Sequence, residues 1–271
     1  GEAMSNHPEI DMMSFTGSTR AGIAVTKGAA ETVKRVSLEL GGKGANIIFS
    51  DCDVEKAVKR GAAHCFNNTG QSCNAPTRML VQKDAYDKAI QVAQEAAENT
   101  EVNEPNLSGN HIGPLVSEVQ YNKVQDLIDA GIKEGAKLIA GGLGRPEGFN
   151  RGYFVRPTVF ADVNNDMRIA REEVFGPVLS IIPFETEEEA IAISNYTSYG
   201  LTDYVQSGDN ERTQRVARQL RAGMVQVNGA PRASGSPFGG YKQSGNGREG
   251  GIEGFEEFLE TKAVSGWTTT S

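Results

Sequence analysis

The stretch that decides the fold is residues 45–82, ANIIFSDCDVEKAVKRGAAHCFNNTGQSCNAPTRMLVQ. It begins and ends with short apolar and β-branched runs, at 45–49 and 78–82, which are typical of buried strands. Between them, residues 53–66 repeat apolar side chains at helical spacing, which predicts an amphipathic helix. A strand, a helix and a second strand in this order form a crossover unit, and such units join parallel strands.

The same alternation continues along the chain on both sides of this unit. Further strands are expected at 36–40, 138–140, 153–160, 178–184, 203–206 and 224–228, and further helices at 23–33, 85–96, 117–133 and 187–196. This pattern predicts an α/β fold with a mainly parallel sheet and flanking helices. Two glycine-rich stretches interrupt it. Residues 141–152 are expected to form a surface excursion, and residues 229–251 a long loop that is functional or disordered.

Composition narrows the classes of protein. The chain has 271 residues, 38% of them hydrophobic, and a formal charge of −8. An acidic chain is a poor general binder of nucleic-acid backbones, and no apolar run approaches the length of a membrane span. Its three cysteines do not make a disulfide framework, and the N-terminus lacks the layout of a signal peptide. We therefore expect a soluble cytoplasmic protein that binds neither nucleic acid nor membrane.

Cys73 is the first candidate for chemistry. It lies in a turn of small polar residues, between Ser72 and Asn74, after the helix at 53–66 and before the strand at 78–82. Such a turn keeps the sulfur accessible, and its backbone N–H groups favour a thiolate and can hold an oxyanion. The alternative is a loop cysteine without a role. Cys65, by contrast, falls on the apolar face of the preceding helix and is expected to pack in the core.

Glu39 is the second candidate. In the strand at 36–40, Val36, Leu38 and Leu40 share one face and Glu39 takes the other. Glycines follow at 41, 42 and 44, so the backbone can approach closely and turn sharply. A carboxylate held at such a strand end suits a general base, although a solvated carboxylate is the ordinary alternative.

The third candidate is the turn at 15–22, FTGSTRAG, which leads into the helix expected at 23–33. Free N–H groups at a helix N-terminus bind anions, but the stretch also fits an ordinary helix capped by Ser18 or Thr19. The three histidines, at 7, 64 and 111, are scattered and predict no metal site.

Taken together, five motifs resemble the aldehyde dehydrogenase superfamily. They are FTGST at 15–19, LELGGK at 38–43, GQSC at 70–73, EEVFGP at 172–177 and PFGGYKQSG at 237–245. They occur in the order that the family shows and extend over almost the whole chain.

The resemblance implies oxidation of an aldehyde to a carboxylic acid. Cys73 would attack the carbonyl to give a thiohemiacetal, hydride would pass to NAD or NADP, and Glu39 would activate a water to hydrolyse the resulting thioester. The cofactor contacts that it implies are Thr16, Gly17, Ser18, Gly22, Leu40, Gly41, Gln120, Lys123, Glu173 and Phe175. The substrate contacts that it implies are Ser72, Asn74 and Phe238.

It also implies a domain organisation and a partial chain. Residues 1–41 would end a cofactor-binding domain, 42–243 would form the catalytic domain, and 244–271 a C-terminal helix with an arm near 259–268 that joins subunits into a dimer or tetramer. Family members are nearly twice as long, and their upstream half supplies a second oxyanion donor and part of the cofactor site. We therefore expect weak or absent activity from this chain alone.

Two alternatives remain open at this stage. The chain could be an inactive fragment that serves only as a folded or oligomerising module. It could also belong to a CoA-acylating semialdehyde dehydrogenase relative, in which CoA resolves the thioester, although Glu39 favours hydrolysis. The aldehyde itself is not readable: Arg232, in the loop at 229–236, either pairs with a substrate carboxylate or is simply exposed.

Overall fold

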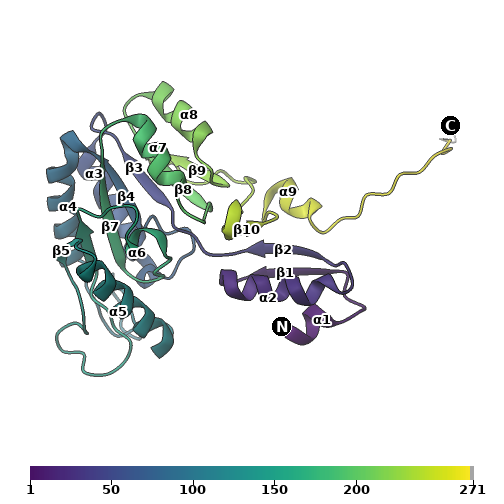
Figure 1. The fold of residues 1–271 in the computed structure, drawn as a ribbon, viewed down its shortest axis with the longest axis horizontal. Helices are drawn as coiled ribbons and strands as arrows, with labels where there is room; N and C mark the ends of the chain where they lie inside the picture. Colours follow the sequence, from purple (N-terminus) through teal and green to yellow (C-terminus); the bar gives the residue numbers. More distant parts are fainter. Residues whose placement is uncertain (269–271) are drawn as a thin grey trace.

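The computed structural model describes residues 1–268, and within them the chain forms two sheets (Figure 1). The larger has seven strands in the order β5-β6-β7-β4-β3-β8-β9. Their bounds are β3 (Ala45–Ile48), β4 (Arg78–Gln82), β5 (Lys137–Ala140), β6 (Thr158–Ala161), β7 (Val178–Phe184), β8 (Thr202–Gln206) and β9 (Met224–Val227). Every pairing is parallel except that of β5 with β6, at one edge. The predicted α/β class is confirmed.

Helices cover both faces of this sheet. On one face, α3 (Val54–Phe66) and α4 (Tyr86–Glu98) pack with Ile48, Met79 and other inward residues. On the other, α5 (Glu118–Lys133), the short α6 (Arg168–Arg171), α7 (Glu187–Asn195) and α8 (Asn210–Gln219) surround a second apolar cluster. Successive residues Ile47 and Ile48 enter opposite clusters, as the alternation of side chains along a strand requires.

The smaller sheet joins the two ends of the chain. In it, β1 (Met12–Thr16) and β2 (Arg35–Glu39) run parallel, linked by α2 (Thr19–Ala30), and β10 (Gly245–Asn246) pairs antiparallel with β2. The remaining short elements are α1 (Glu2–Asn6), α9 (Gly251–Glu256) and the 3₁₀ turns η1 (Asn67–Gly70), η2 (Lys83–Ala85) and η3 (Lys242–Ser244). Beyond α9 the chain runs outward without regular structure as far as residue 268 (Figure 1). The arm expected at 259–268 lies in this segment, and the last three residues of the expected region 244–271 lie outside the described part.

Three expectations about elements need correction. The strand expected at 153–160 begins only at Thr158, because Pro157 has no N–H to donate and restricts the residue before it. The helix expected at 23–33 begins earlier, at Thr19, and ends at Ala30. The loop at 229–251 is not structureless throughout, since its later part contains η3, β10 and the start of α9.

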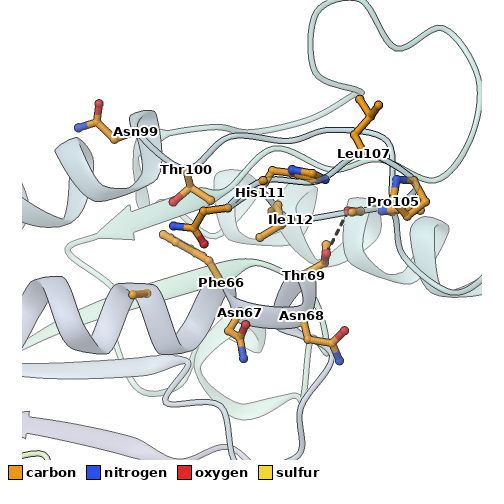
Figure 2. Close-up of a pocket in the computed structure, with 15 residues that line it drawn as sticks. Phe66, Asn67, Asn68, Thr69, Asn99, Thr100, Pro105, Leu107, His111 and Ile112 are labelled. Carbon is orange, nitrogen blue, oxygen red and sulfur yellow. Dashed lines mark hydrogen bonds between the residues drawn. The ribbon is translucent and has the colours of Figure 1, made fainter.

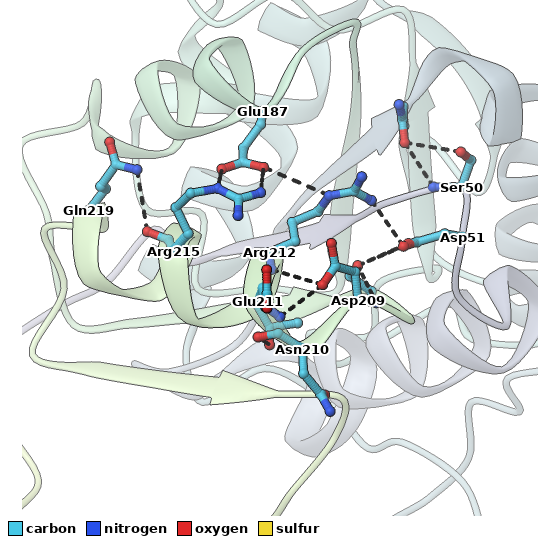
Figure 3. A network of polar contacts seen from close by, with 12 residues as sticks. Ser50, Asp51, Glu187, Asp209, Asn210, Glu211, Arg212, Arg215 and Gln219 are labelled. Carbon is cyan, nitrogen blue, oxygen red and sulfur yellow. Dashed lines mark hydrogen bonds and ion pairs between the residues drawn. The ribbon is translucent and has the colours of Figure 1, made fainter.

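An ion-pair network ties α8 to the start of α7 and to the loop after β3 (Figure 3). Arg215 forms two hydrogen bonds to the Glu187 carboxylate, of 2.7 and 2.8 Å, and Arg212 lies 3.0 Å from an Asp51 carboxylate oxygen. Asp209 caps the helix by accepting from the N–H groups of residues 211 and 212. These contacts compensate for an apolar face that buries little beyond Val216. Among the described residues, no helix is both long enough and apolar enough to span a membrane.

Candidate active site

A cavity of about 520 Å³ lies where the carboxyl ends of β1 and β2 face the large sheet. Its lining consists of Thr16, Gly17, Ser18, Glu39, Leu40, Gly41, Gln71, Ser72, Cys73, Asn74, Gln120, Lys123, Glu173 and Phe175. Every residue that the sequence predicted for the site is among them except Gly22 and Phe238. Segments far apart in the chain are thus brought to one place.

A strained turn presents Cys73 to this cavity. Asn68, Thr69 and Gly70 have φ angles of 51°, 57° and 70°, so three successive residues adopt the left-handed conformation. For threonine this conformation is costly, and the Thr69 hydroxyl donates a 2.9 Å hydrogen bond to the Gly113 carbonyl. Only glycine fits at position 70, because a Cβ there would lie 2.1 Å from the Gly176 carbonyl oxygen.

Gln71 ties the same turn to the segment before α5. Its side-chain oxygen accepts from the Val116 N–H at 2.8 Å, and its amide nitrogen donates to the Asn68 carbonyl at 3.2 Å. The sequence analysis did not predict Gln71 as a site residue, although it stands within the GQSC motif. The hydrogen bond to Val116 crosses 45 residues of chain, and no local sequence pattern reveals it.

The electrostatics of Cys73 correct one expectation. Burial raises the pKa of its thiol, and the carboxylates of Glu173 and Glu39 raise it further. The backbone N–H groups of Cys73 and Asn74 lower it, as expected from the turn. Because burial and the two carboxylates outweigh these N–H groups, the surroundings as a whole favour the thiol over the thiolate.

Glu39 is a buried carboxyl group at the end of β2. It is 4% exposed, and neither of its oxygens has a hydrogen-bond partner within the described structure. Burial, followed by the charge of Glu249, raises its pKa to about 8, while Arg248 acts in the opposite direction. The alternative of a solvated carboxylate is therefore excluded. Gly239 makes the enclosure possible, since a Cβ there would lie 2.7 Å from Oε1 of Glu39.

Glu173 lies across the cavity against the glycines that follow β2. One carboxylate oxygen accepts from the Gly42 N–H at 2.9 Å, and a Cβ on Gly41 would come within 2.5 Å of the other. Burial raises the pKa of Glu173, whereas the Gly42 N–H, Lys123 and Lys43 lower it. The carboxylate is thus fixed in position with one oxygen free of that N–H.

The turn that carries Glu173 is held by α5. The Gln120 amide donates to the carbonyls of Val174 and Phe175, at 2.9 and 2.8 Å. Phe175 itself has a left-handed φ of 52°, which this pair of hydrogen bonds supports. Gln120 therefore stabilises the turn that carries Glu173, and its side-chain oxygen is not needed for this role.

At the opposite side of the cavity, Ser18 begins α2. Its hydroxyl accepts from the Ala21 N–H at 3.3 Å, so it is the N-cap, and it also lines the cavity. The turn at 15–22 is therefore a capped helix start, and its place in the cavity wall is also compatible with an anion-binding role. Gly22 lies outside the lining, one turn into the helix, where a Cβ would meet the Leu40 side chain at 2.8 Å.

Phe238 also lies outside the cavity lining. Its main chain pairs with that of Glu249, with two hydrogen bonds of 2.7 Å, and the Arg232 guanidinium sits 5.7 Å above its ring. Arg232 itself is exposed and donates to the Ser236 carbonyl. The structure thus leaves Arg232 on the surface of the loop.

A second cavity, of about 660 Å³, opens on the other side of η1 (Figure 2). Asn67, Asn68 and Thr69 line it from below, and Pro105, Leu107 and His111 line it from the excursion between α4 and α5. None of the residues predicted for the site lies in it. Within residues 1–268 there is no group of three histidine, cysteine or acidic residues that could hold a metal ion.

Comparison with known proteins decides the family. The model of the aldehyde dehydrogenase family matches residues 1–264. The chain belongs to the aldehyde dehydrogenase family. The resemblance carried by the five motifs is thereby confirmed.

Individual aldehyde dehydrogenases agree in sequence and in fold. A 3-succinoylsemialdehyde-pyridine dehydrogenase of a Pseudomonas species is 58% identical over 98% of this chain and 56% of its own length. The structure of an aldehyde dehydrogenase from Bartonella henselae has 60% identity and a TM-score of 0.96, again over 98% and 56%. A mutant of aldehyde dehydrogenase C from Pseudomonas syringae, solved with NAD⁺ and octanal, has 50% identity and a TM-score of 0.97, over 100% and 56%. The chain thus spans about half the length of the relatives that it matches.

Proposed function

We propose that this chain carries the nucleophile and the general base of an NAD(P)-dependent aldehyde dehydrogenase, which oxidises an aldehyde to a carboxylic acid. The observation that supports it is the shared cavity: Cys73 and Glu39 line one space together with the capped turn at Ser18 and the fixed carboxylate of Glu173. A nucleophile, a carboxyl group with a raised pKa and a helix N-terminus are the parts that acyl chemistry on a dinucleotide-dependent enzyme needs.

The residues present fit a dinucleotide. The cavity volume lies within the range of about 300–1,000 Å³ that is typical of small-molecule sites, and Gly17 and Gly41 add no side chain to its wall. Ser18 and the N-terminus of α2 would hold phosphate, and Glu173 would hold a ribose hydroxyl. Leu40, Phe175, Lys123 and Gln120 would complete the cofactor site. When bound, NAD(P)⁺ would accept a hydride from the former aldehyde carbon of the substrate.

The steps that belong to this chain begin at Cys73. Its thiolate adds to the aldehyde carbon, so a C–S bond forms and the carbonyl oxygen takes the negative charge. The Cys73 N–H is available to stabilise that oxyanion. Once the carbon is at the oxidation level of a thioester, Glu39 takes a proton from a water molecule, whose oxygen attacks the thioester and releases the acid and the Cys73 thiolate.

The pKa shifts predict that these steps favour alkaline conditions. The pKa of the Cys73 thiol is raised, and the pKa of Glu39 is about 8. Both groups act in their ionised forms, so turnover should increase with pH until both have lost their protons. The buried, unpaired carboxyl also favours hydrolysis by water over the CoA-acylating alternative, because it supplies a base beside the thioester.

Domain division, assembly and location belong to the same proposal. We take 1–41, 42–243 and 244–271 as the cofactor, catalytic and oligomerisation parts, with Ser72, Asn74 and Phe238 near the substrate. A homo-dimer or tetramer is supported by exposed apolar side chains on α9 and just beyond it, where Phe255 and Phe258 are each 61% exposed. A cytoplasmic location is supported by three cysteines that are all unpaired.

The test follows acyl transfer at Cys73 as well as redox turnover. Reduced nicotinamide would be measured with NAD⁺ and NADP⁺ over aliphatic, aromatic and carboxylated aldehydes, for the wild type, Cys73→Ala and Glu39→Gln. In parallel, an activated acetyl ester would be added and acylation mapped by mass spectrometry. We expect acetyl-Cys73 to form and to persist about 10²–10⁴-fold longer in Glu39→Gln.

Any reduced nicotinamide should disappear in Cys73→Ala. Turnover that survives this substitution, or failure of Cys73 to acylate, would contradict the proposal. Acylation without redox turnover would favour the alternative of a fragment that is inactive as a dehydrogenase.

A further inference from the structure

Tyr204, on β8, lies directly behind the nucleophile turn. Its hydroxyl donates a 2.7 Å hydrogen bond to the Asn74 carbonyl, across 130 residues of chain. The side chain is 5% exposed, so this hydrogen bond is shielded from water. Neither the sequence motifs nor the cavity lining single out this residue.

The ring of Tyr204 is itself held in place. It packs edge-on against His64 of α3, with ring centroids 5.4 Å apart and planes at 84°. Burial lowers the pKa of His64, so its ring is uncharged and behaves as an aromatic partner. Because α3 leads into η1 and then to Cys73, the tyrosine bridges the strand, the helix and the turn that the helix feeds.

Other contacts confine the turn on its remaining sides. The Ala75 N–H donates to the Ser72 carbonyl at 3.1 Å, which closes the turn locally. Gly42 presses against it from the end of β2, where a Cβ would lie 2.3 Å from the Cys73 carbonyl oxygen. Of these contacts, only that of Tyr204 is a side-chain hydrogen bond to the residue that follows the nucleophile.

We propose that Tyr204 is a positioning residue for Cys73: its hydroxyl anchors Asn74 so that the backbone N–H groups of Cys73 and Asn74 face the sulfur. The inference rests on the proposed role of Cys73 as the nucleophile. Tyr204 does not line the cavity, and its hydroxyl is hydrogen-bonded to the turn, so its effect on Cys73 would pass through Asn74.

Several charges face Cys73 and set the direction of the effect. Glu39 on β2 and Glu173 on the turn after α6 raise the pKa of the thiol, and the two N–H groups lower it. Lys123 of α5 lines the same cavity. Burial raises the pKa of Tyr204, so its hydroxyl stays a donor across the working range. Release of Asn74 would weaken the lowering by the N–H groups, and the pKa of Cys73 would rise further.

The experiment is alkylation of Cys73 by iodoacetamide over a range of pH, with the full chain. Peptide mapping separates Cys73 from Cys52 and Cys65. In Tyr204→Phe we expect alkylation about three- to tenfold slower near neutral pH, which is what a rise of about 0.5–1 pKa unit gives. The rate at high pH, where every molecule holds the thiolate, should match the wild type.

Tyr86→Phe is the matched control. Tyr86 is also a partly buried tyrosine whose hydroxyl is hydrogen-bonded, to Asp162, but it does not line the cavity. We expect it to leave the profile at Cys73 unchanged. Tyr204→Met, which also lacks the hydroxyl, should reproduce the shift of Tyr204→Phe, and circular dichroism would show that each variant is folded.

A profile for Tyr204→Phe that coincides with that of Tyr86→Phe overturns the inference. So does an equal change at every pH, because that would report exposure of the sulfur and not the position of the N–H groups. The readout needs no dehydrogenase turnover. A shifted profile in a chain that never acylates from the ester would therefore overturn the proposed function while leaving the anchoring role of Tyr204 in place.

Discussion

At the scale of single residues, two buried ionisable side chains in and near the site lack hydrogen-bond partners in the described structure. Glu39 is buried without a hydrogen-bond partner, and Lys43, four residues later, is 2% exposed with an Nζ that also lacks one in the described structure. Burial raises the pKa of Glu39 to about 8 and lowers that of Lys43 to about 7. Folding therefore brings the pKa values of both groups close to neutral pH, where each group can gain or lose a proton readily.

Glu39 should make stability depend on pH in a specific direction. Its carboxyl group loses a proton near pH 4.5 in the unfolded chain and near pH 8 in the folded protein. Between these values the folded state holds the extra proton, so the stabilisation falls as the pH rises through this window. Relative to wild type, the free energy of unfolding of Glu39→Gln should therefore rise by about 2 kcal/mol from about pH 5 to about pH 9. The full shift would give about 5 kcal/mol, but water reaches part of the site.

Denaturant titrations at several pH values would measure this. The difference between variants is needed because Lys43, whose pKa is lowered, acts in the opposite direction between about pH 7 and pH 10 in both proteins. Glu185→Gln is a flat control, since Lys83 lowers the pKa of that exposed carboxylate and it is ionised in both states throughout this pH range. A flat difference for Glu39→Gln would show that the carboxyl group is ionised throughout.

At the scale of elements, the glycines between β2 and β3 let three segments approach one another. Gly41 faces the carboxylate of Glu173, Gly42 faces the Cys73 carbonyl, and a Cβ at Gly44 would lie 2.2 Å from the Thr202 carbonyl oxygen. The two sheets meet at this connection, so a change of one atom there affects both the base and the nucleophile.

Gly42→Ala should accordingly displace the nucleophile turn. A backbone oxygen 2.3 Å from the new Cβ cannot rotate away as a side chain would, and we expect a loss of about 2–3 kcal/mol in the free energy of unfolding. Alkylation of Cys73 should change as well. Gly113→Ala is the control, because its Cβ would only reach ordinary contact, 3.8 Å from Pro105. Equal stabilities of the two variants would contradict the close approach seen at Gly42.

Two strands that are buried along almost their whole length have bounds identical to the predicted ones. In β4 and in β7, every residue but one is buried and the runs end at turn residues. α8 was missed because its residues are mostly polar or charged and its support comes from the ion pairs of Arg212 and Arg215. β10 was missed because two residues, Gly245 and Asn246, form a strand only through pairing with β2, more than 200 residues away.

The site divides in the same way. The five motifs contain Cys73, Glu39 and most of the residues that line the cavity, because each motif is a short contiguous stretch. Tyr204 and Gln71 act through hydrogen bonds to backbone atoms far along the chain. A phenol or an amide in a strand or turn carries no local sign of such a partner.

At the scale of the whole molecule, Ser244 connects the two sheets and the C-terminal segment. It is fully buried, and its hydroxyl donates to the Gly41 carbonyl at 2.6 Å and accepts from the Gly200 N–H at 3.0 Å. Its own carbonyl accepts from the Leu40 N–H at 2.9 Å. The end of β2, the approach to β8 and the start of β10 therefore meet at one side chain.

Ser244→Ala should loosen this junction more than its size suggests. The Gly41 carbonyl and the Gly200 N–H would both lose their partner in the interior, at about 1–3 kcal/mol each, so we expect a total loss of about 2–4 kcal/mol. The loss should not be uniform, because β4 and β7 have their own buried ladder. Amide hydrogen exchange should accelerate in β1 and β2 well before it does in β4.

Ser50→Ala is the control, since its hydroxyl bonds to Gln82 at the surface. Uniform acceleration across both sheets would contradict this prediction, because it would mean that the sheets unfold as one unit. The shape of the cavity between them would then depend on the whole fold and not on this junction.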